Sequence, residues 1–160
     1  MAAELMTLPP FERISDLWNR GQLIPFLGPG ASVVGRSPHE GYSPAHPSSP
    51  PSAAELADLL ASEVNFPSTD ANLRTDLTLV SSYFEVMHGR GPLQNRIREL
   101  LDRDYDPAPL HKLIASFSIP QLIVVSTHDT LVEDAFRRIG KPFDVVTHSS
   151  DRREIAREVV

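Results

Sequence analysis

Two short stretches of the sequence carry residue types that could hold a nucleotide. The first follows the apolar run LIPFL and consists of Gly28, Pro29, Gly30, Ala31 and Ser32. Glycines let the backbone turn sharply and approach a ligand, and three backbone N–H groups and a hydroxyl could bind a phosphate. A purely structural corner explains the turn equally well. Val33 stands where the dinucleotide fingerprint needs a third glycine, and no Gly-Lys-Ser follows.

The second stretch, STHD, follows the clearest strand pattern of the chain, QLIVVS. Ligands of parallel α/β sheets bind at the carboxyl ends of strands, so we expect both stretches to lie at one edge. Asp129 and Glu133 are spaced i,i+4 and could face a site as paired carboxylates. We favour a local role for both: Thr130 to Glu133 has the spacing of a capping box, and Asp129 suits the first turn of a helix.

The elements that must position these stretches alternate between helix and strand. Apolar periodicity and capping residues predict helices over 10–20, 52–64, 77–89, 92–103, 109–117, 127–140 and 151–160, and strands over 23–27, 121–126 and 142–148. The last two strands flank a helix and predict a βαβ unit with parallel pairing. We therefore expect one α/β domain over residues 1–160, with a Rossmann-like parallel sheet flanked by helices.

A segment rich in proline and serine, residues 36–52, interrupts this pattern. It cannot build a core, and we expect a mobile surface loop. Its place beside the glycine turn makes it a candidate lid, and a tolerated insertion explains it at least as well.

Composition excludes several classes of function. The chain has no cysteine, which excludes disulfides and thiolate metal sites. It has 15 Lys and Arg against 21 Asp and Glu, a net charge of −6. An acidic chain without a basic cluster is a poor nucleic-acid binder, and Arg152-Arg153 is expected on a solvated helix face. No signal peptide or membrane-spanning run is found, so we expect a cytoplasmic protein without a membrane partner.

The histidines outside the STHD stretch are assigned structural roles. His111 is expected at a helix start, packed under the sheet. His39 and His46 lie in the Pro/Ser segment without the clustered partners that a metal needs, so no metal is predicted. In HGRG, Arg90 could approach a phosphate, but a helix C-cap is the favoured interpretation.

The order of the segments GQLIPFLGPGAS, LVSSYFEVMHGRGPL, PLHKLIASF and LIVVSTHDTLVEDAF resembles the bacterial Sir2-like family, distant relatives of the sirtuins. The resemblance touches nearly the whole chain. Gly28, Gly30 and Ser32 match the family's Gly-x-Gly-x-Ser motif. Asp129, Leu131 and Glu133 match the later part of its second motif, Thr-Thr-Asn-Tyr-Asp followed by Leu-x-Glu.

The resemblance implies a nucleotide-binding fold that holds NAD as its cofactor. The residues 28–32 would lie at the phosphates, and Thr127, His128 and Asp129 would border the ribose as catalytic residues. Family members often cleave the nicotinamide–ribose bond, and many act in antiviral defence. Such an NAD glycohydrolase needs no metal. The alternatives left open are a non-catalytic sensor of NAD or ADP-ribose and a protein-interaction module.

The sequence departs from the family at two points. Thr127 stands where the family has its Asn, and His128 stands at its Tyr, where it could supply a base in compensation. The family also continues to a further strand and a catalytic His, whereas His148 lies too early and lacks the adjacent Gly. The chain therefore corresponds to the first part of the family's domain, with a truncated sheet. A longer parent protein with a further C-terminal domain, a homo-oligomer and a minimal free-standing form are all open.

Overall fold

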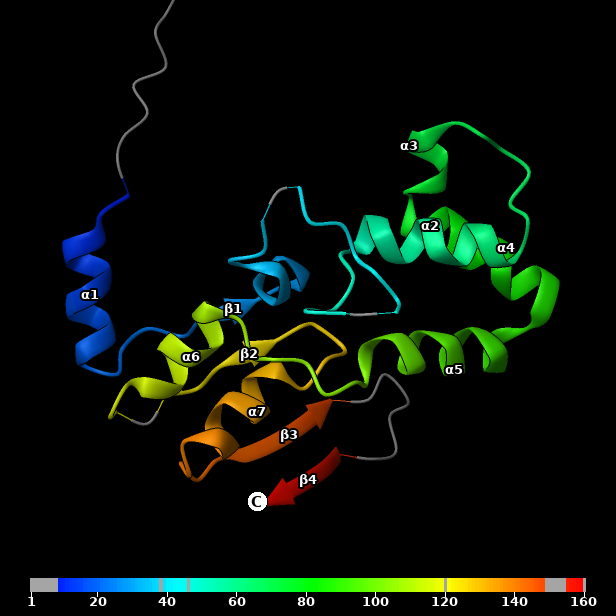
Figure 1. Cartoon of the computed structure of the whole chain (residues 1–160). Helices are drawn as coiled ribbons and strands as arrows, with labels where there is room; N and C mark the ends of the chain where they lie inside the picture. Colours follow the sequence, from blue (N-terminus) through cyan, green and yellow to red (C-terminus); the bar gives the residue numbers. More distant parts are fainter. Residues whose placement is uncertain (1–8, 38, 46, 120, 149–154, 160) are drawn as a thin grey trace, which may run out of the picture.

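The computed structural model describes residues 9–37, 39–45, 47–119, 121–148 and 155–159, the last range and His148 by their backbone alone. Within these residues the chain is mixed α/β and mostly helical, with seven α-helices and two small sheets (Figure 1). The helices form two lobes. The α/β class is confirmed, while the sheet is much smaller than a complete Rossmann sheet.

The α/β lobe is built on two parallel strands, β1 (Phe26–Leu27) and β2 (Val124–Val125). Phe26 pairs with Val124 and Leu27 with Val125. The helices α6 (Pro109–Ser116) and α7 (Leu131–Arg138) pack on one another beside this pair. Their apolar faces and the inward side of the strands form one core, which consists of Leu27, Ala31, Ile114, Ala115, Val132, Ala135 and Phe136.

The helical lobe consists of α2 (Ala53–Glu63), α3 (Ala71–Arg74), α4 (Leu77–His88) and α5 (Arg90–Leu101). It inserts between the two strands of the parallel pair in sequence and lies to one side of them in space (Figure 1). Its core is separate and larger, and it consists of Leu56, Ala57, Leu60, Ala61, Val64, Val80, Phe84, Leu93 and Leu100.

Local capping signals place most helix ends where the sequence predicts them. Ser52 and Glu55 form the expected capping box at the start of α2: the Glu55 N–H donates to Ser52 Oγ (3.3 Å) and the Ser52 N–H to Glu55 Oε2 (2.8 Å). Gly89, with φ of 91°, ends α4, so the C-cap interpretation of HGRG is confirmed. The short α3 is not predicted, because a single turn capped by Asp70 has no apolar period.

The predicted strand pairing is wrong. β3 (Asp144–His148) pairs antiparallel with β4 (Ile155–Val159), and β2 pairs with β1 instead. The expected βαβ unit therefore does not form a hydrogen-bonded parallel pair. The helix predicted over 151–160 is also wrong for residues 155–159, which form the strand β4. Arg152 and Arg153 lie outside the described residues.

The segment 36–52 is tied to the helical lobe, which differs from the free loop that its composition predicts. Arg36 donates to Glu55 Oε2 (2.6 Å), and the Tyr42 N–H donates to Glu55 Oε1 (2.7 Å). Pro50 is fully buried. One partly buried carboxylate thus binds both Arg36 and Tyr42 of the segment, a role that composition alone does not indicate.

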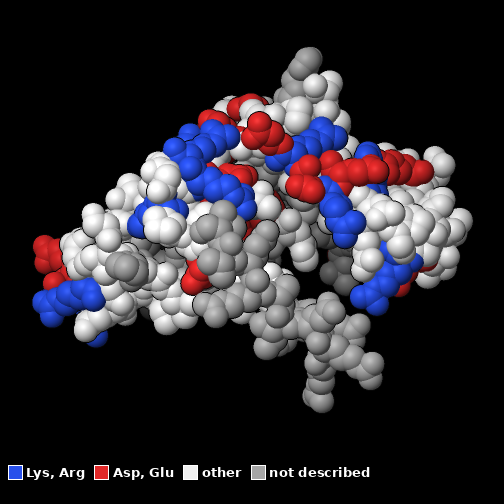
Figure 2. Space-filling view, turned by 90° about the horizontal axis from the view of Figure 1, so that it is seen from below, with Lys and Arg blue, Asp and Glu red and all other residues white. Residues whose placement is uncertain are grey.

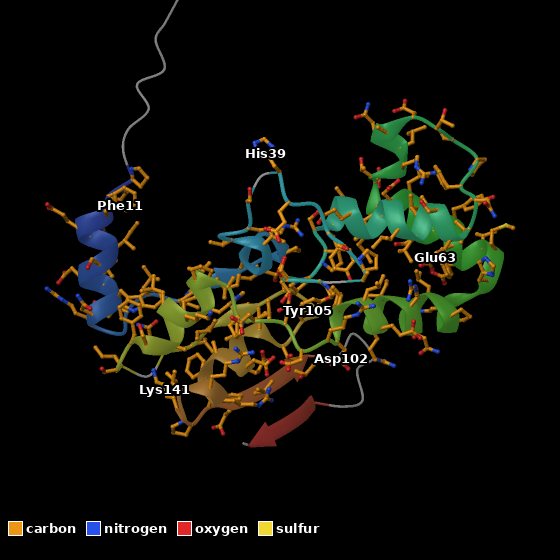
Figure 3. All side chains as sticks on the ribbon, in the orientation of Figure 1. Phe11, His39, Glu63, Asp102, Tyr105 and Lys141 are labelled. Carbon is orange, nitrogen blue, oxygen red and sulfur yellow. The ribbon has the colours of Figure 1, made fainter. Side chains whose placement is uncertain are left out.

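The two lobes meet around Tyr105, which lies at their junction in Figure 3 and is 2% exposed. Its hydroxyl donates to the Leu100 carbonyl (2.6 Å) and lies 3.3 Å from the Tyr42 hydroxyl. Burial raises the pKa of Tyr105, and the contact with Tyr42 adds to this. Arg138 of α7 binds Asp106 and the Tyr105 carbonyl, and so joins the α/β lobe to the same junction.

Candidate functional site

The glycine turn leads from β1 into a short 3-10 helix, η1 (Pro29–Val33). Gly28 has extended backbone, and the Ala31 N–H donates to the Gly28 carbonyl (2.9 Å). Ala31 and Ser32 are buried. A helix that starts at the turn would favour a phosphate through its backbone dipoles. A helix of five residues starts there, so its backbone dipoles add little and a ligand would depend on individual N–H groups.

The second stretch lies directly beside this turn. β2 runs parallel to β1, so the residues that follow both strands emerge at the same edge, as the sequence predicts. The Ser126 N–H and hydroxyl both donate to the Leu27 carbonyl, at 2.9 and 3.1 Å. Beyond Ser126, Thr127 and Asp129 are half-buried, while His128 is exposed.

A hydrogen bond joins the two stretches. The Ser32 hydroxyl donates to Asp129 Oδ2 at 2.6 Å, across 97 residues of sequence. The other oxygen of Asp129 accepts from the Leu131 N–H at 3.2 Å, in the first turn of α7. Asp129 therefore performs the expected helix-start role and also fixes the glycine turn to α7. The structure brings Ser32 and Asp129 together but gives Thr127 and His128 no such link.

The predicted capping role of Glu133 is wrong. Thr130 directs its hydroxyl to Asp134 Oδ2 (2.9 Å), and the Leu131 N–H is capped by Asp129. Among the described residues, Glu133 Oε2 is buried and has no hydrogen-bond partner. Burial raises the pKa of Glu133, and the charges of Asp129 and Asp134 add to this, although a hydrogen bond from its own backbone N–H and the charge of Arg137 oppose the shift. One oxygen of this carboxylate is thus left unsatisfied close to Asp129.

His111 lies behind the site at the start of α6 and is 2% exposed. Its Nδ1 accepts from the Ala108 N–H (3.1 Å), which confirms the predicted helix-start role. Burial lowers the pKa of His111, and the charge of Asp129 partly opposes the shift. The lowered pKa favours the neutral form of His111 near pH 7. The sequence does not predict that Asp129 lies close enough to His111 to affect this pKa.

The glycines near the site differ in whether the fold needs them. Gly35 has a φ of +89°, and a Cβ built there would lie 3.0 Å from Pro109 Cγ, so the fold requires glycine. A Cβ on Gly28 would meet only Ser126 Oγ, at 3.9 Å. A Cβ on Gly30 would meet nothing within 4 Å, and its φ is not positive. Neither packing nor backbone conformation explains why residue 30 is glycine.

The hollows of the surface lie away from this edge. Two of about 360 Å³ are found, one on α5 and one between α1 (Phe11–Asn19) and the end of α6. Their linings are Asn95, Arg98, Glu99 and Asp102 in the first, and Trp18, Asn19, Ser116, Phe117, Ser118 and Ile119 in the second. Neither of these two hollows includes the glycine turn.

Charge and metal chemistry add no competing site among the described residues. Acidic and basic side chains are interspersed on the face shown in Figure 2. No group of three or more His, Asp and Glu side chains in the described part of the chain could hold a metal ion. None of the described helices is both long and apolar enough to cross a membrane.

Comparison with known proteins identifies no relative. No family model, no curated protein and no solved structure matches the chain.

Proposed function

We propose that the chain binds NAD at the carboxyl edge of the β1–β2 pair, as a Sir2-like domain that cleaves the nicotinamide–ribose bond. The observation that carries the proposal is the Ser32–Asp129 hydrogen bond of 2.6 Å. It closes the two motif stretches on one another at the edge where parallel α/β sheets take their ligands. The proposal includes the finer fold assignment, in which β1 and β2 are the first part of a Rossmann-like sheet.

Gly30 gives the proposal its second support. The space that a side chain would take at residue 30 is empty of protein atoms, and the conformation permits any residue. Gly91 has the same open space, so the support comes from the position of Gly30 in the turn beside Asp129, where another group could approach the backbone. NAD phosphates would be held by the N–H groups of this turn, because the proton of the Ser32 hydroxyl is already donated to Asp129.

The residues of the second stretch would serve the ribose. Asp129 uses each carboxylate oxygen once, and a carboxylate has about four lone-pair positions, so it can still accept from ribose hydroxyls. Thr127 would orient the ribose and water with a single hydroxyl. The cleavage develops positive charge at the ribose carbon, and the Asp129 and Glu133 carboxylates are the nearby groups that could stabilise it.

Binding without cleavage is the second candidate function. Thr127 is half-buried at the end of β2 and offers one hydroxyl where the family's amide offers a donor and an acceptor. His128 is exposed, and the structure gives it no hydrogen bond to Ser32 or Asp129. A Thr127→Asn variant separates the two functions. A rise in nicotinamide release would show that the pocket lacks only the amide, and no rise would favour a sensor.

The first test is incubation with NAD, with nicotinamide release followed by chromatography and binding by calorimetry. Gly30→Ala should keep the thermal unfolding temperature and abolish both signals. Gly91→Ala is the matched control, because a Cβ at Gly91 of α5 also meets nothing within 4 Å. It should leave both signals unchanged. A wild-type chain that binds no NAD, or a Gly30→Ala variant that binds it as well, would overturn the proposal.

A further inference from the structure

One face of the β1–β2 pair is uncovered. Residues that alternate along the strands point to opposite faces, and Leu27 and Val125 face the core under α6 and α7. Phe26, which alternates with Leu27, is 71% exposed, and Ile24 and Leu122, each two residues before the start of a strand, are 60% and 66% exposed. Parallel strands occur almost only in sheets covered on both faces. An apolar face of this kind is therefore a surface that needs a partner.

A second apolar surface without a partner lies on α1. Phe11 is 66% exposed and Ile14 39%, one turn apart on the helix, and α1 contains no buried residue. The helix stands away from the rest of the chain, with Phe11 at its far end (Figures 1 and 3). The chain thus carries an exposed apolar helix stripe and exposed apolar strand residues, and packing a helix on a sheet is one way to bury both.

The two surfaces do not meet within one copy, because α1 is fixed at its other end. The Trp18 ring packs on Phe117 with centroids 4.6 Å apart, and Gln121 Nε2 donates to the Trp18 carbonyl at 3.1 Å. These contacts hold α1 where Phe11 and Ile14 remain exposed.

We propose that these two surfaces form the interface of a symmetric homodimer, in which the Phe11–Ile14 stripe of each copy covers the Ile24, Phe26 and Leu122 face of the other. The exchange is reciprocal, so the contact closes at two copies.

Area and charge both favour a second copy as the occupant. With about 150–200 Å² for a fully exposed large side chain, the five side chains present on the order of 500 Å². A standard interface buries about 800 Å² per partner, of which about 56–65% is non-polar, so the available apolar area suffices. The strand runs 23–27 and 121–125 contain no charged residue, so two chains of net charge −6 can meet there without repulsion.

Light scattering and sedimentation over a wide micromolar range of concentration test the proposal. The wild-type chain should dimerise, and Phe26→Thr should raise the dimer Kd about tenfold or more, because buried aromatic anchors dominate interfaces. Thr keeps β-propensity, and circular dichroism checks the fold. Val86→Thr on α4 is the matched control, because Val86 is apolar and 82% exposed on the other lobe. It should dimerise like the wild type.

Phe11→Ser tests the helix half of the contact and should weaken the dimer similarly. If Phe26→Thr does not fold, Leu122→Thr replaces it. A wild-type chain that stays monomeric across the range overturns the proposal, whatever other partner the face then binds. A dimer that survives both Phe26→Thr and Leu122→Thr, or that Phe11→Ser leaves intact, overturns this interface. NAD binding is measured separately, so neither result depends on the proposed function.

Discussion

The helical lobe and the α/β lobe bury their apolar residues to different degrees. In the helical lobe, Leu60, Val80 and Leu100 are 0% exposed, and the helices α2, α4 and α5 close around them, while Val86 on the outside of α4 is 82% exposed. In the α/β lobe, Leu27 of β1 is buried, while Phe26 of β1 and Leu122, two residues before β2, are 71% and 66% exposed. The α/β lobe carries the candidate site, and in our proposal a second copy covers its exposed strand residues.

The polar contacts of the two lobes differ as well. In the helical lobe, Glu55 caps α2 and binds the segment 36–52, and Arg96 of α5 pairs with Glu63 of α2. In the α/β lobe, the Ser32–Asp129 bond and the unpartnered Glu133 oxygen lie at one edge of the strand pair. Functional sites commonly keep polar groups that stability alone would remove.

A matched pair of leucine substitutions, one in each lobe, should show the largest difference in the free energy of unfolding. Leu60→Ala should lower the free energy of unfolding by about 3–4 kcal/mol, because it leaves a cavity in a closed core. Leu122→Ala should change it by no more than about 0.5 kcal/mol in the monomer, since this side chain is 66% exposed. Urea unfolding of dilute protein measures both values. Equal losses would mean that the sheet face is covered within one copy.

Glu55 offers the next largest effect, because one carboxylate caps α2 and holds the segment 36–52. Burial alone would raise the pKa of Glu55, but the hydrogen bonds from Ser52, Arg36 and Tyr42 outweigh it and lower the pKa to about 2. Glu55→Ala should cost about 2–3 kcal/mol, since it also leaves Arg36, whose side chain is 13% exposed, without its partner.

The pH dependence of the same variant provides its control. The unfolded chain takes up a proton at Glu55 near pH 4.5, and the folded chain only near pH 2. The stabilisation is therefore complete above pH 4.5 and is lost as the pH falls from there towards 2. The wild type and Glu55→Ala should converge in this window. A difference that stays constant below pH 4.5 would assign the loss to packing and not to the carboxylate.

The sequence predicts the helix ends of the helical lobe well and the pairing of the last strands poorly. The Ser52–Glu55 capping box and the Gly89 stop depend on residues within one turn, and both are confirmed. The antiparallel pairing of β3 with β4 is missed because the sequence predicts a helix over 151–160, so that β3 has no following strand to pair with. Tertiary context decides such pairings.

The candidate site shows the same division. That the two motif stretches share an edge follows from parallel topology, which the strand patterns indicate. The Ser32–Asp129 bond spans 97 residues, and nothing near either residue predicts that one donates to the other. Thr130 and Glu133 have the spacing of a capping box, but Asp129, the residue before the N-cap, accepts from the N–H of Leu131, and the Thr130 hydroxyl donates to Asp134. The spacing alone does not show that these neighbouring carboxylates take the local hydrogen bonds.

Glu133→Gln should give the smallest change in the free energy of unfolding, and this change should be an increase. A buried carboxylate oxygen without a partner costs stability, so the amide should raise the free energy of unfolding near pH 7 by about 1 kcal/mol. Burial raises the pKa of Glu133, so the folded chain holds this proton more tightly than the unfolded chain. The cost of the carboxylate therefore grows as the pH rises from 4.5 through the folded pKa.

Thermal unfolding of Glu133→Gln and wild type over this pH range measures the effect. The two should have the same unfolding temperature at pH values below 4.5 and separate above it. Asp134→Asn is the control, because Asp134 lies on the same turn and is paired with Arg137 at 2.8 Å, so its amide should not stabilise. If Glu133→Gln loses stability, its carboxylate has a partner in solution and the α/β lobe is as closed at this edge as the helical lobe. If it gains stability, the carboxylate at this edge destabilises the fold, as a group kept for ligand binding would.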